Sequence, residues 1–224
     1  DGKNEIVFVN LFYERQSSFL PKTGISIYEN TSDNNYTLVF KDSIDRFVKG
    51  DNLVTGDFNG DGKKDFAVGV VSKDGDLIQY YSLYTYTSAG NNSYEIMDVT
   101  DIYNYKSYTE TSTKSSDIDN DGREEVMSNT GTLFYILNFN TSIGRFIPEF
   151  YMPDINTFNQ IAFDFDGNGV KELGLNTVND TLLFFEKNVS FTGPATPLNF
   201  NGFSLDSNSV SISFDAVPGA EKYN

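Results

Sequence analysis

The sequence predicts an all-β protein, and three observations support this class. Phenylalanine (20) and tyrosine (14) greatly outnumber methionine (3), and aromatic side chains suit a pleated, half-buried sheet surface. The apolar runs are short and are bounded by turn residues, which favours strands. An aspartate-rich pattern recurs along the chain, so the strands belong to a repeated unit. With 224 residues, 38% of them hydrophobic, the chain is long enough to bury a core.

The recurring pattern is D-x-[DN]-x-[DN]-G-x-x-[DE], whose residues are numbered here as positions 1 to 9. Three complete copies begin at Asp57, Asp117 and Asp164, which are 60 and 47 residues apart. The first five residues, Asp-Gly-Lys-Asn-Glu, fit positions 5 to 9 of a fourth copy. Recurrence at such intervals is typical of architectures in which each repeat buries one face against the next repeat.

The strands of the unit can be placed in order. Short segments with strand character precede the complete copies, at 53–55, 114–116 and 160–163, and apolar segments follow them, at 66–71, 126–129 and 173–177. Turns at 73–75, 130–131 and 179–180 lead into longer aromatic strands at 77–86, 133–139 and 182–186, and one unit adds a fourth strand at 36–40. Three or four antiparallel strands per unit of about 50 residues match a β-propeller blade. We therefore expect a propeller fragment of about three and a half blades, with a β-sandwich as the alternative.

The pattern also supplies oxygen ligands in the arrangement that calcium needs. Ca²⁺ takes six to eight oxygens, and side chains at positions 1, 3, 5 and 9 with the backbone carbonyl of position 7 would provide them around the turn that Gly at position 6 permits. Magnesium fits less well because it prefers strict octahedral geometry and retains its waters. The candidate ligands are Asp57, Asn59, Asp61, Lys63, Asp65, Asp117, Asp119, Asp121, Arg123, Glu125, Asp164, Asp166, Asn168, Val170, Glu172 and, in the incomplete copy, Asp1 and Glu5.

Two other interpretations of the loops can be compared with this one. An EF-hand needs a bidentate Glu at position 12, where this sequence has Val68, Ser128 and Leu175. Asp, Asn and Gly also gather in ordinary tight turns, but such a turn needs no acid at position 9. The sequence therefore favours about three calcium sites and one truncated site.

Composition limits the function further. The formal charge of −16 would repel nucleic acid and anionic lipid, and no run of 18 apolar residues is available to span a membrane. The chain has no His, the commonest general base, and no Cys for disulfides or thiolate chemistry. We therefore expect no catalytic residues, and we expect calcium to replace disulfides as the cross-link of an extracellular, secreted or cell-surface protein.

The stretch Asp-Phe-Asn-Gly-Asp-Gly-Lys-Lys-Asp-Phe-Ala-Val-Gly at 57–69, with its relatives at 117 and 164, resembles the FG-GAP and VCBS-type repeats. These are the calcium-loop blades of integrin α-subunits and of many secreted microbial proteins. The Phe-Gly and Gly-Ala-Pro signatures are absent, so the resemblance is closer to the VCBS and bacterial variants. It covers residues 1–190, and it implies a propeller, usually of seven blades, with calcium bound at the loops on one face.

The end of the chain resembles a different module. After a linker at 191–197, residues 198–224 are similar to the start of a fibronectin type III domain, with an alternating strand at 209–214. Each end of the sequence lies within a recognisable unit of which only a part is present. We therefore expect the chain to be a fragment of a longer modular protein.

These features predict a non-catalytic module for adhesion or for binding an unidentified protein or glycan. The alternative is a part of a secreted polysaccharide-degrading enzyme such as a polysaccharide lyase. Two groups of tyrosines are candidate platforms for sugars, although such residues more often pack between sheets; they are Tyr80, Tyr84 and Tyr86, and Tyr103, Tyr105 and Tyr108. Six Asn-x-Ser/Thr sequons, beginning at residues 30, 35, 91, 140, 179 and 188, are compatible with an exposed surface.

Overall fold

The computed structural model contains strands, turns and loops over the residues that it describes, which are 3–12, 22–74, 77–103, 111–130, 133–179, 181–186, 201–206 and 209–213. The predicted all-β class is therefore confirmed. The chain divides into two compact units, Asp1–Glu186 and Lys187–Asn224. Within the described ranges, no helix has the length and apolar character needed to cross a membrane.

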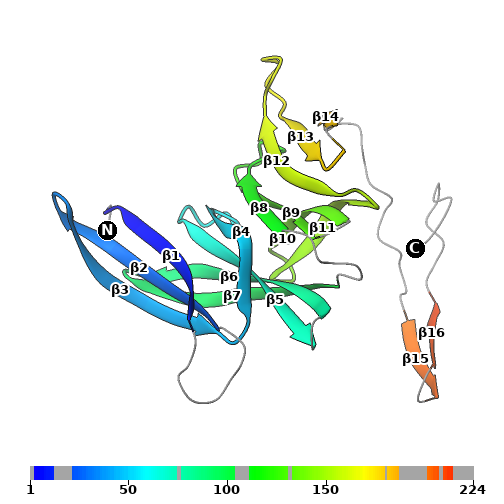
Figure 1. Cartoon of the computed structure of the whole chain (residues 1–224), viewed down its shortest axis with the longest axis horizontal. Coiled ribbons are helices and arrows are strands. Elements are labelled where there is room, and N and C mark those ends of the chain that lie inside the picture. The colour runs from blue at the N-terminus through cyan, green and yellow to red at the C-terminus, as the bar shows by residue number, and fades with distance from the viewer. Residues whose placement is uncertain are drawn as a thin grey trace. The chain divides into compact units, whose positions relative to one another are not determined.

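The first unit consists of four successive repeats (Figure 1). Repeat 1 contains β1 (Glu5–Phe12), β2 (Lys22–Ser32) and β3 (Asn35–Ile44). Repeat 2 contains β4 (Phe47–Gly56), β5 (Asp65–Asp74), β6 (Leu77–Gly90) and β7 (Ser93–Tyr103). Repeat 3 contains β8 (Thr111–Ser116), β9 (Glu125–Thr130), β10 (Leu133–Asn140) and β11 (Arg145–Pro153), and repeat 4 contains β12 (Thr157–Phe163), β13 (Glu172–Thr177) and β14 (Leu182–Glu186). Consecutive strands within each repeat pair antiparallel.

The strand segments predicted from the aspartate-rich pattern all lie within observed strands, and so does 36–40, which lies within β3. Four of the observed strands were not predicted from the sequence: β1, β2, β7 and β11. The last of these carries Pro148 and Pro153, and proline lowers the expectation of a strand because it donates no ladder hydrogen bond. β11 is the outermost strand of repeat 3, where such a residue is tolerated.

Repeats 2 and 3 meet at their first strands. A single parallel pairing, Asp51 with Ser112, joins β4 to β8 and merges the two repeats into a sheet of eight strands. The Thr113 hydroxyl donates to the Asn52 side-chain oxygen at 2.9 Å, and the Ser115 hydroxyl donates to the Thr55 carbonyl at 3.0 Å. The described strands do not close into a ring.

Adjacent repeats pack through the same motif positions. To describe these positions, the residues that follow position 9 in the second strand of each repeat are numbered 10, 11 and 12. Side chains at positions 2 and 11 face the following repeat, and those at positions 10 and 12 face the preceding repeat. Position 10 is Ile6, Phe66, Val126 or Leu173, position 11 is Val7, Ala67, Met127 or Gly174, and position 12 is Phe8, Val68, Ser128 or Leu175.

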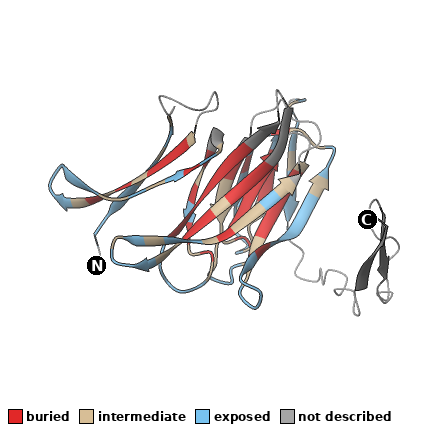
Figure 2. Ribbon diagram, turned by 90° about the horizontal axis from the view of Figure 1, so that it is seen from below, coloured by how far each residue is buried: buried red, intermediate tan, exposed pale blue. Residues whose placement is uncertain are grey.

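Three apolar clusters follow this rule. Between repeats 1 and 2, Val7 packs on a cluster that includes Phe66 and Val68. Between repeats 2 and 3, Phe58 and Ala67 share a cluster with Val126. Between repeats 3 and 4, the cluster contains Ile118, Met127, Leu173 and Leu175. Because each repeat covers its neighbour, the core of this unit lies between the repeats, and buried residues gather on its middle strands (Figure 2).

Tyr84 and Tyr86 of β6 pack in the apolar cluster between repeats 1 and 2. Tyr86 is 1% exposed and stacks on Phe66 with ring centroids 4.6 Å apart, so it offers no sugar platform. Tyr84 is partly buried against the same cluster, and the Arg46 guanidinium lies over its ring in a cation–π contact. The packing alternative is thus confirmed for this pair. Tyr105 and Tyr108 lie outside the described residues, as do the side chains of Tyr80 and Tyr103.

The second unit contains a described antiparallel hairpin, formed by β15 (Asn201–Asp206) and β16 (Ser209–Ser213). β16 coincides with the strand predicted near 209–214. The fibronectin type III assignment and the boundaries at 190 and 197 remain predictions.

Candidate metal centre

Three loops with the same backbone course connect the first and second strands of repeats 2, 3 and 4. Position 6 is glycine with a left-handed φ in each loop, as the sequence predicts: Gly62 (79°), Gly122 (92°) and Gly169 (89°). Position 4 is also left-handed, and it is occupied by Gly60 (77°), Asn120 (60°) and Gly167 (77°). This second turn point was not predicted from the sequence, although glycine and asparagine are the residues that tolerate such a φ.

The acid at position 1 organises each turn by accepting backbone hydrogen bonds. Asp57 accepts the N–H groups of Gly60 and Gly62, both at 2.8 Å. Asp117 accepts those of Asp121 and Gly122, and Asp164 accepts those of Gly167, Asn168 and Gly169. These bonds hold the carboxylate of position 1 against the backbone of each loop.

The acid at position 9 closes the loop from the second strand. It accepts the backbone N–H of position 2 in all three copies: Asp65 from Phe58 at 3.2 Å, Glu125 from Ile118 at 2.7 Å and Glu172 from Phe165 at 2.7 Å. An ordinary turn does not need this acid, and in each copy its hydrogen bond ties the start of the second strand to the backbone of position 2.

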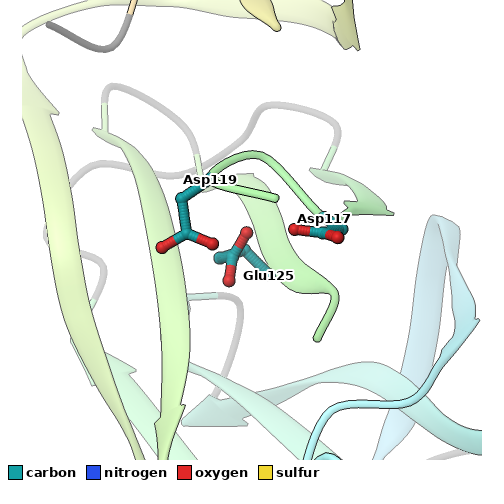
Figure 3. Close-up of side chains that lie close together, drawn as sticks. All are labelled: Asp117, Asp119 and Glu125. Atoms are coloured by element: carbon teal, nitrogen blue, oxygen red, sulfur yellow. The ribbon is translucent and has the colours of Figure 1, made fainter. Parts of the chain in front are cut away.

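In the loop at 117, three carboxylates converge. Asp117, Asp119 and Glu125 each place an oxygen within 4.8 Å of the other two. Figure 3 shows these three side chains close together. Glu125 is only 1% exposed, and its Oε1 has no hydrogen-bond partner. Burial raises the pKa of Glu125 to about 8, with a further contribution from the negative charges of Asp119, Glu149 and Asp121, although the bond from Ile118 opposes it.

The loop at 164 brings together the equivalent residues. Asp164, Asp166 and Glu172 place oxygens within 4.8 Å of one another. This group is more open than the first, because Asp166 is exposed and both Asp164 and Glu172 are partly exposed. The same three motif positions therefore bring their carboxylates together in both loops, so this arrangement is a property of the repeated motif.

The loop at 57 differs at position 3, where Asn59 replaces an acid. The Asn59 side-chain oxygen accepts the Asp61 N–H at 2.9 Å, and its amide donates to the Thr87 hydroxyl at 3.2 Å. Asp65 is 1% exposed, and burial raises its pKa above the usual range. This loop therefore offers two carboxylates and an amide oxygen in place of three carboxylates.

Position 5 supports the turn in each loop. Asp61, Asp121 and Asn168 accept the backbone N–H of position 7, from Lys63, Arg123 and Val170 at 2.9, 2.9 and 2.7 Å. Asp121 also accepts a hydrogen bond from the Arg123 side chain at 3.0 Å. A metal-ligand role for positions 5 and 7 stays a prediction. In the incomplete copy, Glu5 begins β1 and accepts the Tyr94 hydroxyl at 2.9 Å, whereas Asp1 lies outside the described residues.

Comparison with known proteins gives one family for the N-terminal part. Residues 1–68 match the model of an FG-GAP-like repeat. The match spans repeat 1 together with the first strand, the loop and the start of the second strand of repeat 2. No curated protein matches this chain.

The three loops are also connected to one another, which was not predicted from the sequence. The side chain at position 8 of one loop forms a hydrogen bond with the backbone of position 1 in the preceding loop. Glu124 accepts the Asp57 N–H at 2.5 Å and the Lys64 ammonium at 2.5 Å, and Lys171 donates to the Asp117 carbonyl. The Lys64 ammonium and the Asp57 N–H lower the pKa of Glu124 in spite of its burial, which alone would raise it.

The donor set of these loops fits a hard divalent cation. The convergent groups are oxygens, and the chain has neither His nor Cys to bind a softer metal. The unpartnered Oε1 of Glu125 is costly in a buried place unless a proton or a cation satisfies it. Carboxylates held within 4.8 Å also repel one another, and a cation between them would remove that repulsion.

Proposed function

We propose that this chain is a calcium-binding module of the β-propeller type, with its repeats as blades, and that it acts outside the cell in adhesion or in binding a protein or glycan without catalysis. The observation that supports the proposal best is the cluster of Asp117, Asp119 and Glu125, with its buried, unpartnered carboxylate oxygen. The FG-GAP-like match and the successive repeats of three or four antiparallel strands support the propeller architecture.

Calcium would have a structural role in this proposal. Asp117, Asp119 and Glu125 would hold one ion and Asp164, Asp166 and Glu172 a second, while Asp57, Asn59 and Asp65 would hold a third. Each ion would fix the loop to the first residue of the following strand, because position 9 begins β5, β9 and β13. Three ions would add six positive charges and reduce the net charge from −16 to −10.

The position-8 contacts extend this effect from one loop to its neighbour. Glu124 lies directly before the ligand Glu125 and bonds to the backbone of Asp57, which is itself a ligand of the preceding loop. Lys171 repeats the arrangement between Glu172 and Asp117. Metal binding would therefore order a connected row of loops and hold the cysteine-free sheets together.

The proposal is tested by titrating chelator-treated protein with calcium and with magnesium in a calorimeter, and by measuring thermal melts in both states. We expect two or three calcium sites, weaker binding of magnesium, and a higher melting temperature with calcium. The double variant Asp117→Asn/Asp164→Asn should lose most of this response, whereas the control Asp33→Asn, in the β2–β3 turn, should keep it. The absence of binding heat and of any thermal shift at millimolar calcium would reject the proposal.

A further inference from the structure

The turn between the third and fourth strands carries an Asn-x-Ser/Thr sequon in each of repeats 1, 2 and 3. In repeat 1, β1 begins at position 9, as β5, β9 and β13 do, so β2 and β3 are the third and fourth strands of that repeat. The equivalent turns are therefore β2–β3, β6–β7 and β10–β11. Their sequons begin at Asn30 and Asn35, at Asn91 and at Asn140.

Three of these asparagines lie where the chain reverses direction. Asn35 pairs with Ser32 directly after a two-residue turn, and Asn91 lies in the turn between the paired residues Gly90 and Ser93. Both asparagines are exposed. The Ser or Thr of each of the three sequons is exposed as well; these residues are Thr37, Ser93 and Ser142.

Asn140 ends β10 and is partly exposed. Its Oδ1 accepts the Ser142 N–H at 3.0 Å, so the carbonyl oxygen supports the turn. This bond does not use Nδ2, the atom to which a glycan would be attached. A bulky group at any of the three asparagines therefore leaves the buried clusters between the repeats undisturbed.

The distribution of the sequons has more weight than their number, because Asn, Ser and Thr are frequent in any turn. The inner strands contain the buried residues Asn52 and Asn129, and neither begins a sequon. The metal loops are also turns, but their asparagines begin no sequon either; these are Asn59, Asn120 and Asn168. Four of the five sequon asparagines among the described residues lie in one type of turn.

These turns lie at the same end of the repeats as the metal loops. The Lys63 ammonium donates to the Ser88 carbonyl at 3.3 Å, and the Arg123 guanidinium donates to the Phe139 carbonyl at 2.9 Å. Ser88 and Phe139 belong to the strands that lead into the β6–β7 and β10–β11 turns. The sequons therefore recur beside the loops, once for each repeat.

We propose that Asn35, Asn91 and Asn140 are acceptor sites for N-linked glycans, one on the equivalent turn of three successive repeats. An exposed sequon on a turn of a secreted protein is the setting in which this modification occurs. The inference rests on the extracellular location in the proposed function, and it does not depend on calcium.

Two other described sequon asparagines are not included. Asn30 is partly buried within β2, and its backbone N–H donates to the Asn4 carbonyl at 2.9 Å. Asn179 lies in the β13–β14 turn, between the second and third strands and thus at the opposite end of its repeat. The Thr181 hydroxyl of that sequon donates to the Asn179 carbonyl at 3.3 Å.

The reaction is a group transfer in which nothing is oxidised or reduced. The sugar donor is an oligosaccharide on a polyprenyl phosphate carrier. Nδ2 of the asparagine forms a bond to the anomeric carbon of the sugar as the bond from that carbon to the phosphate oxygen breaks. The phosphate departs with the electron pair, and the amide nitrogen releases one proton. The hydroxyl two residues further along identifies the acceptor.

Secretion of the full chain from eukaryotic cells tests the acceptor sites, since these cells supply the compartment and the sugar donor. An amidase that removes N-linked glycans converts each modified asparagine to aspartate, and peptide mass spectrometry then locates the conversion. We expect it at Asn35, Asn91 and Asn140. Replacing any one of them by Gln should remove one step of electrophoretic mobility. Asn159→Gln, at an exposed asparagine of β12 outside any sequon, is the control and should remove none.

A second set of variants keeps each asparagine and removes only the hydroxyl: Thr37→Ala, Ser93→Ala and Ser142→Ala. Each should lose the same glycan as the matched Gln variant, and circular dichroism would verify folding. A secreted, folded chain with all three asparagines unmodified would overturn the proposal. Modified asparagines in a chain that binds no calcium would leave it standing while rejecting the metal sites, and unmodified asparagines beside normal calcium binding would overturn this inference alone.

Discussion

The substitution Glu125→Gln distinguishes a metal ligand from a residue that only stabilises the turn. Glutamine has nearly the same shape, and its carbonyl oxygen can still accept the Ile118 N–H that Glu125 accepts at 2.7 Å. It also removes an ionisable group from a place that is 1% exposed. In a chelator, the free energy of unfolding should therefore change by less than about 1 kcal/mol, or rise slightly.

In calcium the same substitution should be destabilising. An ion present at a hundred times its dissociation constant stabilises the folded state by about 2.7 kcal/mol. Loss of one of three carboxylates should weaken binding by about a hundredfold, the upper end of the range for changes around metal ligands. The remaining stabilisation would be about 0.4 kcal/mol, so the substitution should cost about 2.3 kcal/mol in calcium.

Urea unfolding followed by circular dichroism, in calcium and in chelator, measures both values. Glu95→Gln, at an exposed residue of β7, is the control and should leave the two curves unchanged. Equal costs of Glu125→Gln in calcium and in chelator would refute the ligand role.

Two further predictions follow from the packing of the repeats and from the contacts between loops. Phe58→Ala should lower the free energy of unfolding by about 3–5 kcal/mol, because Phe58 is fully buried between repeats 2 and 3, whereas Phe165→Ala should cost about 1 kcal/mol or less. Urea unfolding measures both, and equal costs would contradict the packing rule. Glu124→Ala should cost about 1–3 kcal/mol, since it leaves the Asp57 N–H and the Lys64 ammonium without this partner. Thermal unfolding of Glu124→Ala beside Glu95→Ala would test this cost, and matching melting temperatures would argue against it.

The sequence by itself determined the all-β class and the local course of the three loops. A loop of nine residues is governed by its own φ preferences and by hydrogen bonds within it, such as those from the Asp57 carboxylate. These depend on neighbours along the chain, so Gly62, Gly122 and Gly169 predict the turn correctly. The second turn point, at Gly60, Asn120 and Gly167, has the same local cause and is predictable from the same residue types.

Only the tertiary structure decided which of the equivalent residues are buried. Phe58 and Phe165 occupy the same motif position and are the same residue type, but one is 0% and the other 50% exposed. Their exposures differ because repeat 3 covers Phe58, whereas no described repeat covers Phe165. The residues around each motif do not encode whether another repeat packs against it. The contacts of Glu124 and Lys171 with the preceding loops have the same cause, because their partners lie 67 and 54 residues away in the chain.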